Sequence, residues 1–276
     1  MPALPPDLRF HGVSFDPASK AVRSFGPEQL DRELADPAVF SWIDLWGQDI
    51  GALNAVLQRR GIDLVLASHF DAPEVLPRLL ERPDCLGFYL YEVEDPERHL
   101  DTSRGISTFR FHRLLLVLGV DFVITFHRKP LAAVEEIKAT CGESFRLAGR
   151  TAGFIPFLFL QRCLYDYAHL NLANDNALDL MDEELLVTHT TGREPELAAA
   201  SQNILTLKKL TASLHIVLMH LATKRSPFIS PEGAASFKEM LQNALAVRAA
   251  VASSQDLRDG ILGAIQANAS QRMADI

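Results

Sequence analysis

Three aspartates in the second half of the chain have a spacing that suits a metal ion. Asp175, Asp179 and Asp182 are separated by four and three residues, so they share one face if the segment is an α-helix. Like charges four residues apart destabilise a helix by about 0.2–0.5 kcal/mol per pair, and a bound cation would relieve that repulsion. Hard divalent ions such as Mg²⁺ bind one or two carboxylates and keep several waters. The spacing alone leaves two interpretations open, a divalent-cation site and, as the commoner case, a solvated acidic face.

The sequence holds none of the common catalytic or phosphate-binding motifs. It contains no G-x-x-x-x-G-K-[ST] loop, no G-x-G-x-x-G after a strand, no G-x-S-x-G elbow and no H-E-x-x-H. His112 and His127 lie on neighbouring predicted strands and could approach each other, but a histidine pair lacks the third ligand of a zinc site. We therefore expect no catalytic site, and we expect Cys163 to be a small buried apolar residue.

The first half of the chain alternates short apolar runs with Gly, Pro and Asp. Such runs predict strands at Phe40–Trp46, at Leu86–Val93 and, in two runs separated at Gly119, within Phe109–Phe126. Apolar residues at helical spacing predict helices at 27–35, 48–60 and 130–139. Strands mixed with helices predict an α/β layer domain, a mixed sheet with helices in an α/β/α arrangement, over residues 1–153.

After residue 153 the sequence predicts three long helices, at about 155–187, 196–225 and 231–276. Gly and Pro are nearly absent inside them, and Ser230 followed by Pro231 is a good helix start. We divide this half into a two-helix arm, 154–229, and a stalk helix, 230–276. The stalk would be roughly 69 Å long at 1.5 Å per residue. Its apolar stripe indicates a bundle or coiled-coil seam and consists of Met240, Ala244, Val247, Val251, Ser254, Arg258, Ile261 and Ile265.

Composition excludes several classes of protein. The 27 Lys and Arg against 35 Asp and Glu give a net charge of −8, which argues against a nucleic-acid partner. Cys85, Cys141 and Cys163 are widely spaced and odd in number, which fits a reducing compartment. No run of roughly 20 apolar residues predicts a membrane span, and the N-terminus lacks the basic region of a signal peptide. We expect a cytoplasmic chain.

The order of these elements resembles the cytoplasmic part of the CorA family of divalent-cation channels. The strand Trp42-Ile43-Asp44-Leu45 looks like the family's W-I-D-L strand, and Arg60-Gly61-Ile62 like its helix ending in Gly-Ile. Residues 112–137 are similar to the family's paired strands and following helix. The acidic turn Leu178–Leu185 resembles that of its first long helix, and the last helix resembles its stalk.

This resemblance implies an architecture and a set of partners. The family forms homopentameric funnels, in which the stalk helices surround the ion path and continue into the first membrane span. Ile276 would then lie just before that span, and the chain would be a soluble cytoplasmic piece of a membrane protein. The implied function is a regulatory, ion-sensing domain of a CorA-like divalent metal-ion transporter. Mg²⁺ is the first expected ion, with Co²⁺ or Zn²⁺ as alternatives.

The resemblance also implies metal ligands. In the family, acids between neighbouring subunits bind regulatory divalent ions. Asp175 and Asp179 fall on two such positions of the first long helix, and Glu239 falls on a third, near the start of the stalk. Where the family has two opposing acids after Gly-Ile, this chain has Ala67 and Ser68, so we expect weaker binding.

Two further departures bear on selectivity and on the alternatives. Asp63, His69 and Asp71 lie near the two missing acids but out of register, and Ala274 stands where many members have a stalk asparagine that lines the pore. The ion preference is therefore expected to differ from that of a typical Mg²⁺ channel. Two other functions stay open, a cytosolic coiled-coil scaffold and a metal-dependent enzyme that uses the aspartates with His112 and His127.

Overall fold

The first half of the chain folds into one curved sheet covered by helices. A computed structural model of the chain describes residues 8–62, 70, 79–100, 105–149, 151–188, 192–223 and 227–274. Seven strands pair in the order β2-β1-β3-β7-β6-β5-β4. Their bounds are β1 Arg9–Phe15, β2 Val22–Phe25, β3 Phe40–Trp46, β4 Leu79–Glu81, β5 Leu86–Val93, β6 Phe111–Leu118 and β7 Phe122–His127. Only β3 and β7 are parallel among these pairs; the other neighbours are antiparallel.

The predicted central strands are confirmed. The strands β3, β5 and β7 are buried along almost their whole length, as expected for apolar strands with both faces covered. Gly119 lies in the tight turn between β6 and β7, where its amide donates to the Phe122 carbonyl (2.9 Å). A Cβ at this position would meet the Phe122 ring at 2.1 Å, so the close approach requires glycine.

Helices follow the strands and then dominate the chain. The short ones are η1 Pro27–Gln29, α1 Leu30–Ala35, α2 Ile50–Gln58 and α4 Pro96–Leu100, and the longer ones are α5 Ala132–Ala148, α6 Phe154–Thr188, α7 Glu194–Thr223 and α8 Pro231–Ala274. One face of the sheet packs on α5 and α6: the Trp42 ring lies edge-on to Phe159 of α6, with 5.7 Å between ring centroids. The α5 helix runs nine residues beyond the predicted 130–139.

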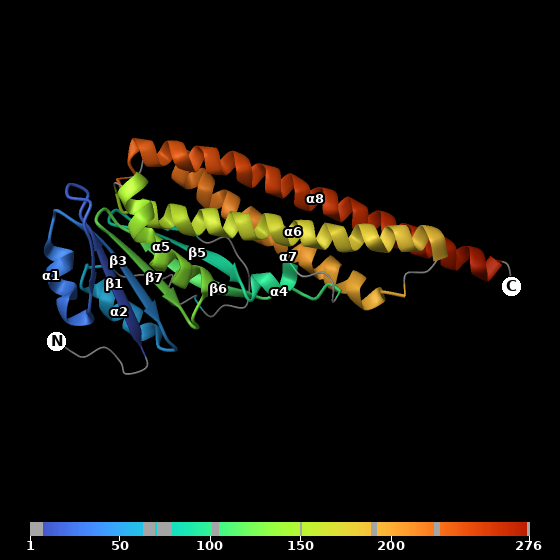
Figure 1. Cartoon of the computed structure of the whole chain (residues 1–276), viewed down its shortest axis with the longest axis horizontal. Coiled ribbons are helices and arrows are strands. Elements are labelled where there is room, and N and C mark those ends of the chain that lie inside the picture. Colours follow the sequence, from blue (N-terminus) through green and yellow to red (C-terminus); the bar gives the residue numbers. More distant parts are fainter. Residues whose placement is uncertain are drawn as a thin grey trace.

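The three long helices lie side by side and project from the sheet (Figure 1). Phe157 of α6 contacts Phe237 of α8 at 5.9 Å between ring centroids, and Asn171 of α6 contacts Ser254 of α8 further along. These two contacts show that α6 and α8 run parallel, with α7 returning antiparallel. The α8 helix begins as predicted, because the Ser230 hydroxyl accepts the Gly233 amide (3.1 Å) and caps the first turn.

The predicted stripe of α8 is confirmed as its packing seam. Five of the eight stripe residues are buried and the other three are half-buried. The α7 helix is long and apolar enough to cross a membrane, which the sequence analysis did not predict. Half of its most apolar segment is buried inside the fold, as in the core helix of a folded domain, so its length and composition are weak evidence for a membrane span.

A carboxylate without a counter-ion is buried between β5 and α6. Glu92 is 4% exposed, and its Oε1 has no hydrogen-bond partner among the described residues. The nearest cation, Arg162, donates to both oxygens of Asp166 (3.0 Å each) and pairs with Glu136. Burial, followed by the charge of Asp166, raises the pKa of Glu92 to about 8. Glu92 is therefore protonated at neutral pH in the folded chain.

This burial makes stability depend on pH. The ordinary pKa of the group is 4.5, so between pH 4.5 and 8 the folded chain holds a proton that the unfolded chain has lost. Glu92 should lower the free energy of unfolding by about 1.4 kcal/mol per pH unit in that window, and no further above it. We expect Glu92→Gln to remove this slope in urea unfolding curves recorded from pH 5 to pH 8. The exposed Glu143→Gln is the matched control, and an unchanged slope in Glu92→Gln would contradict the assignment.

Candidate metal-binding site

Asp175 faces the stalk helix and not open solvent. It lies midway along α6 and is half-buried. Asn171, one turn earlier, donates from Nδ2 to Asp175 Oδ2 (3.0 Å). The Ser254 hydroxyl of α8 donates to Asn171 Oδ1 (3.1 Å). A continuous line of hydrogen bonds therefore joins the Asp175 carboxylate to the middle of α8.

The second oxygen of this carboxylate is without a protein partner. Asp175 Oδ1 is buried and accepts no hydrogen bond from any described residue. Burial raises the pKa of Asp175 and the charge of Asp179 adds to the rise, whereas the nearby Ser254 hydroxyl opposes it as a possible donor. In the geometry seen, that hydroxyl faces Asn171 Oδ1 and the Ala250 carbonyl and not Asp175 Oδ1. A buried carboxylate oxygen with no donor is unfavourable, and a cation bound to it would remove the cost.

The other members of the acidic face are more accessible. Asp179 is exposed one turn beyond Asp175, and Asp182 is half-buried. The influence of Asp179 on the pKa of Asp175 shows that the two carboxylates are near each other. An ion held between them would have one buried ligand and one solvated ligand, with room for water on the solvent side.

Glu239 lies elsewhere in the same chain. It is exposed near the start of α8, whereas Asp175 faces Ser254. Glu239 precedes Ser254 by 15 residues, which is about 22 Å along an α-helix. A single chain therefore does not bring the three predicted ligands together.

The histidine pair does not form a centre either. His127 Nε2 lies 3.2 Å from Asp44, and His112 Nε2 lies 3.3 Å from Glu94, so each ring is held by a different carboxylate. Within the described ranges, no three His, Cys, Asp or Glu side chains converge as metal ligands. Cys163 is buried, as predicted.

Five residues that the sequence analysis names near the expected opposing acids lie outside the described residues: Asp63, Ala67, Ser68, His69 and Asp71. The sequence analysis did not single out Asn171, and it named Ser254 only as a member of the α8 stripe. The signal for both was present: each is a polar residue on the buried stripe of its helix, and Asn171 precedes Asp175 by four.

Comparison with known proteins gives a consistent result. A family model described as CorA-like Mg²⁺ transporter protein matches residues 37–276. A search of curated proteins finds no match. Among solved structures, the soluble domain of CorA from Methanocaldococcus jannaschii is similar, with a TM-score of 0.73 and 14% identity, covering 94% of this chain and 97% of that one.

Two further structures share the fold. The full-length CmaX protein has a TM-score of 0.77 and 15% identity, and the match covers 100% of this chain and 81% of that one. The ZntB cytoplasmic domain from Vibrio parahaemolyticus has a TM-score of 0.64 and 13% identity, covering 95% of this chain and 99% of that one. At these identities the structures confirm the predicted fold class, a mixed sheet followed by long helices.

The geometry of Asp175 predicts that its charge costs stability. A raised carboxyl pKa means that the cost is present above the ordinary value of 3.8 and is lost at lower pH. Asp175→Asn should therefore raise the free energy of unfolding at pH 7. The increase should be at least the repulsion of one like-charge pair on a helix, about 0.2–0.5 kcal/mol. Metal-free denaturation curves test this, with Asp256→Asn, an exposed aspartate of α8, as the control. A less stable Asp175→Asn would show that the carboxylate has a partner that compensates its charge.

Proposed function

Because the chain belongs to the CorA-like Mg²⁺ transporter family, we propose that it is the cytoplasmic, ion-sensing domain of a divalent metal-ion transporter. The family match extends over both the sheet and the long helices. The observation that carries the sensing role is Asp175: its Oδ1 has no hydrogen-bond partner among the described residues, and its Oδ2 is linked through Asn171 to the stalk helix. The domain lies on the cytoplasmic side of the membrane and has no catalytic site.

The proposed ion binds between Asp175 and Asp179. The residues present fit a hard cation, because both ligands are carboxylates and one has an unused buried oxygen. Glu239 is left out of this ligand set, because stalk helices that surround one axis keep the separation of about 22 Å between Glu239 and Asp175 in neighbouring copies too. A set of oxygen ligands without cysteine or histidine favours Mg²⁺ over Zn²⁺, and Co²⁺ is the intermediate case.

Two hydrogen bonds connect the proposed ion site to the stalk helix. The Asp175 carboxylate fixes the amide of Asn171, and Asn171 in turn accepts from Ser254 of α8. A cation that moves or neutralises Asp175 would therefore change a hydrogen bond in the α6–α8 interface. This polar contact lies within an apolar seam, where its loss has no compensation from water.

The stalk helix also supports an oligomer. Gly260 and Gly263 lie inside the continuous α8 helix, where each costs up to about 1 kcal/mol of stability relative to alanine. Nothing in the described chain lies within 4 Å of a Cβ placed at either position, so the packing of this chain requires neither glycine. Close approach of α8 to copies of itself would account for both, as in a homopentameric funnel whose stalks surround an axis.

Mg²⁺ should stabilise the folded chain through the acidic face. At 100 times its dissociation constant, an ion that binds only the folded state adds about 2.7 kcal/mol. We expect a thermal melt in millimolar Mg²⁺ to shift upward for wild type and to shift little for Asp175→Asn/Asp179→Asn. Asp256→Asn should respond as wild type does.

Glu239→Gln is a second control for this experiment. It should respond to Mg²⁺ as wild type does, because Glu239 lies about 22 Å along α8 from the residue that faces Asp175. If wild type and the double variant respond identically to Mg²⁺, the acidic face is a solvated surface and the proposed site is wrong.

A further inference from the structure

A cavity lies where α6 and α8 begin, far from the acidic face. Its volume is about 220 Å³, and it is lined by Thr151, Gly153, Phe154, Phe157, Ile229, Ser230, Glu232, Gly233, Ser236 and Phe237. Phe157 precedes Asp175 by 18 residues on α6, which is about 27 Å. The cavity is therefore separate from the proposed metal site.

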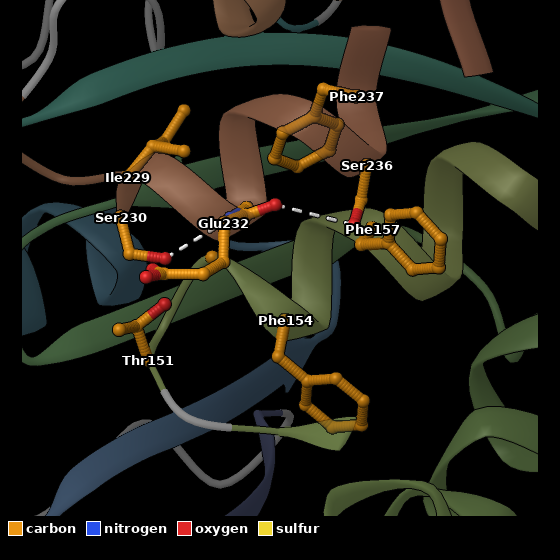
Figure 2. A pocket seen from close by; sticks show the side chains of 10 residues that line it. Thr151, Phe154, Phe157, Ile229, Ser230, Glu232, Ser236 and Phe237 are labelled. Atoms are coloured by element: carbon orange, nitrogen blue, oxygen red, sulfur yellow. Dashed lines mark hydrogen bonds between the residues drawn. The ribbon is translucent and has the colours of Figure 1, made fainter. Parts of the chain in front are cut away.

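The walls of this cavity are divided by polarity. Figure 2 shows the rings of Phe154, Phe157 and Phe237 along one side, with Glu232 and the hydroxyls of Thr151 and Ser230 on the other. Phe157 and Phe237 form an edge-to-face pair, 5.9 Å between centroids. Phe154 and Phe157 are only half-buried, so apolar surface remains available to a ligand.

The polar groups of the cavity are mainly acceptors. Ser236 lies beside the Phe157 ring (Figure 2), and its hydroxyl donates to the Glu232 carbonyl (3.4 Å), which leaves its lone pairs free. Glu232 forms no ion pair with any described residue, and none of the ten lining residues is basic. Glu232 is in the first turn of α8, where the positive end of the helix dipole favours its charged form.

We propose that this cavity binds a small organic cation, a primary alkylammonium with an apolar stem. The ammonium group would donate to the Glu232 carboxylate and to the neighbouring Thr151 hydroxyl (Figure 2), and the stem would lie against the phenylalanine rings. The volume exceeds the roughly 150 Å³ of an apolar cavity that holds benzene, so a six-carbon stem fits. An inorganic divalent ion suits the cavity less well, because one carboxylate and apolar walls supply too few oxygen ligands.

Three ligands with the same stem and different head groups test this assignment. Hexylamine, hexanol and hexanoate would be titrated against the full chain at pH 7 and followed by ligand-observed NMR. We expect hexylammonium to bind at least about threefold more tightly than hexanol, which is the gain expected from an ion pair with a partly solvated carboxylate. Hexanoate should bind most weakly, because its charge has the same sign as that of Glu232.

Two variants assign the preference to particular side chains. Glu232→Gln should abolish the advantage of the amine over the alcohol while leaving hexanol binding unchanged, and the exposed Glu143→Gln should keep it. Ser236→Phe, which places a ring at the cavity, should weaken all three ligands. Equal binding of amine and alcohol to wild type would overturn the proposal, as would an amine preference that survives Glu232→Gln.

A second copy of the chain is the competing source of an ammonium group, through a lysine side chain. Sedimentation of wild type with and without hexylamine distinguishes the two. Self-association that hexylamine disrupts, and that Glu232→Gln also removes, would assign the cavity to a neighbouring lysine and overturn the proposal of a free ligand.

Discussion

The buried carboxylate of Asp44 is the constraint on which the sheet and its helices depend. Asp44 is 0% exposed at the centre of β3, and a charge there is tolerated only with compensating partners. Lys138 of α5 (2.9 Å), His127 of β7 (3.2 Å) and the Thr125 hydroxyl (2.6 Å) surround it. Burial raises the pKa of Asp44, but the hydrogen bond and charge of His127 and the charge of Lys138 outweigh burial and lower it. A slip of β3 by one residue would place this charge on the opposite face, away from all three partners.

That register also determines where α6 begins. Trp42 shares the face of Asp44, donates from Nε1 to Thr125 (3.0 Å), and contacts Phe159 of α6. From this anchor α6 runs outward to a polar layer within the helical bundle. Asn174 accepts from Asn203 of α7 (3.2 Å), while Asn171 accepts from Ser254 of α8. Because buried amides must be paired, these contacts fix the relative register of the three helices more narrowly than the apolar seam does.

Much of this arrangement was predictable from the sequence, and the part that was not has a physical reason. Pro and Gly punctuation located the three long helices to within about three residues, because these residues act locally on the backbone. The edge strands β2 and β4, and β1 next to β2, carry too little apolar alternation to be predicted. Helical spacing correctly placed Asp175 and Asp179 near each other. It could not show that Asp175 faces α8, or that Glu239 is about four turns or more from both, because periodicity assigns a residue to a face but not to a neighbour.

The inward orientation of Asp175 changes what the acidic face can do. A fully solvated aspartate pair would bind a cation with little effect on the rest of the chain, since water already stabilises both charges. Asp175 has lost part of that water, and within the described residues its free oxygen has no donor to replace it. A proton or a cation bound to the Asp175 carboxylate therefore changes its energy relative to the unbound carboxylate. That change acts on the hydrogen bonds of Asn171 and Ser254. A sensor needs such a differential interaction with two states, and Asp175 provides it at a position that hydrogen bonds connect to the stalk helix.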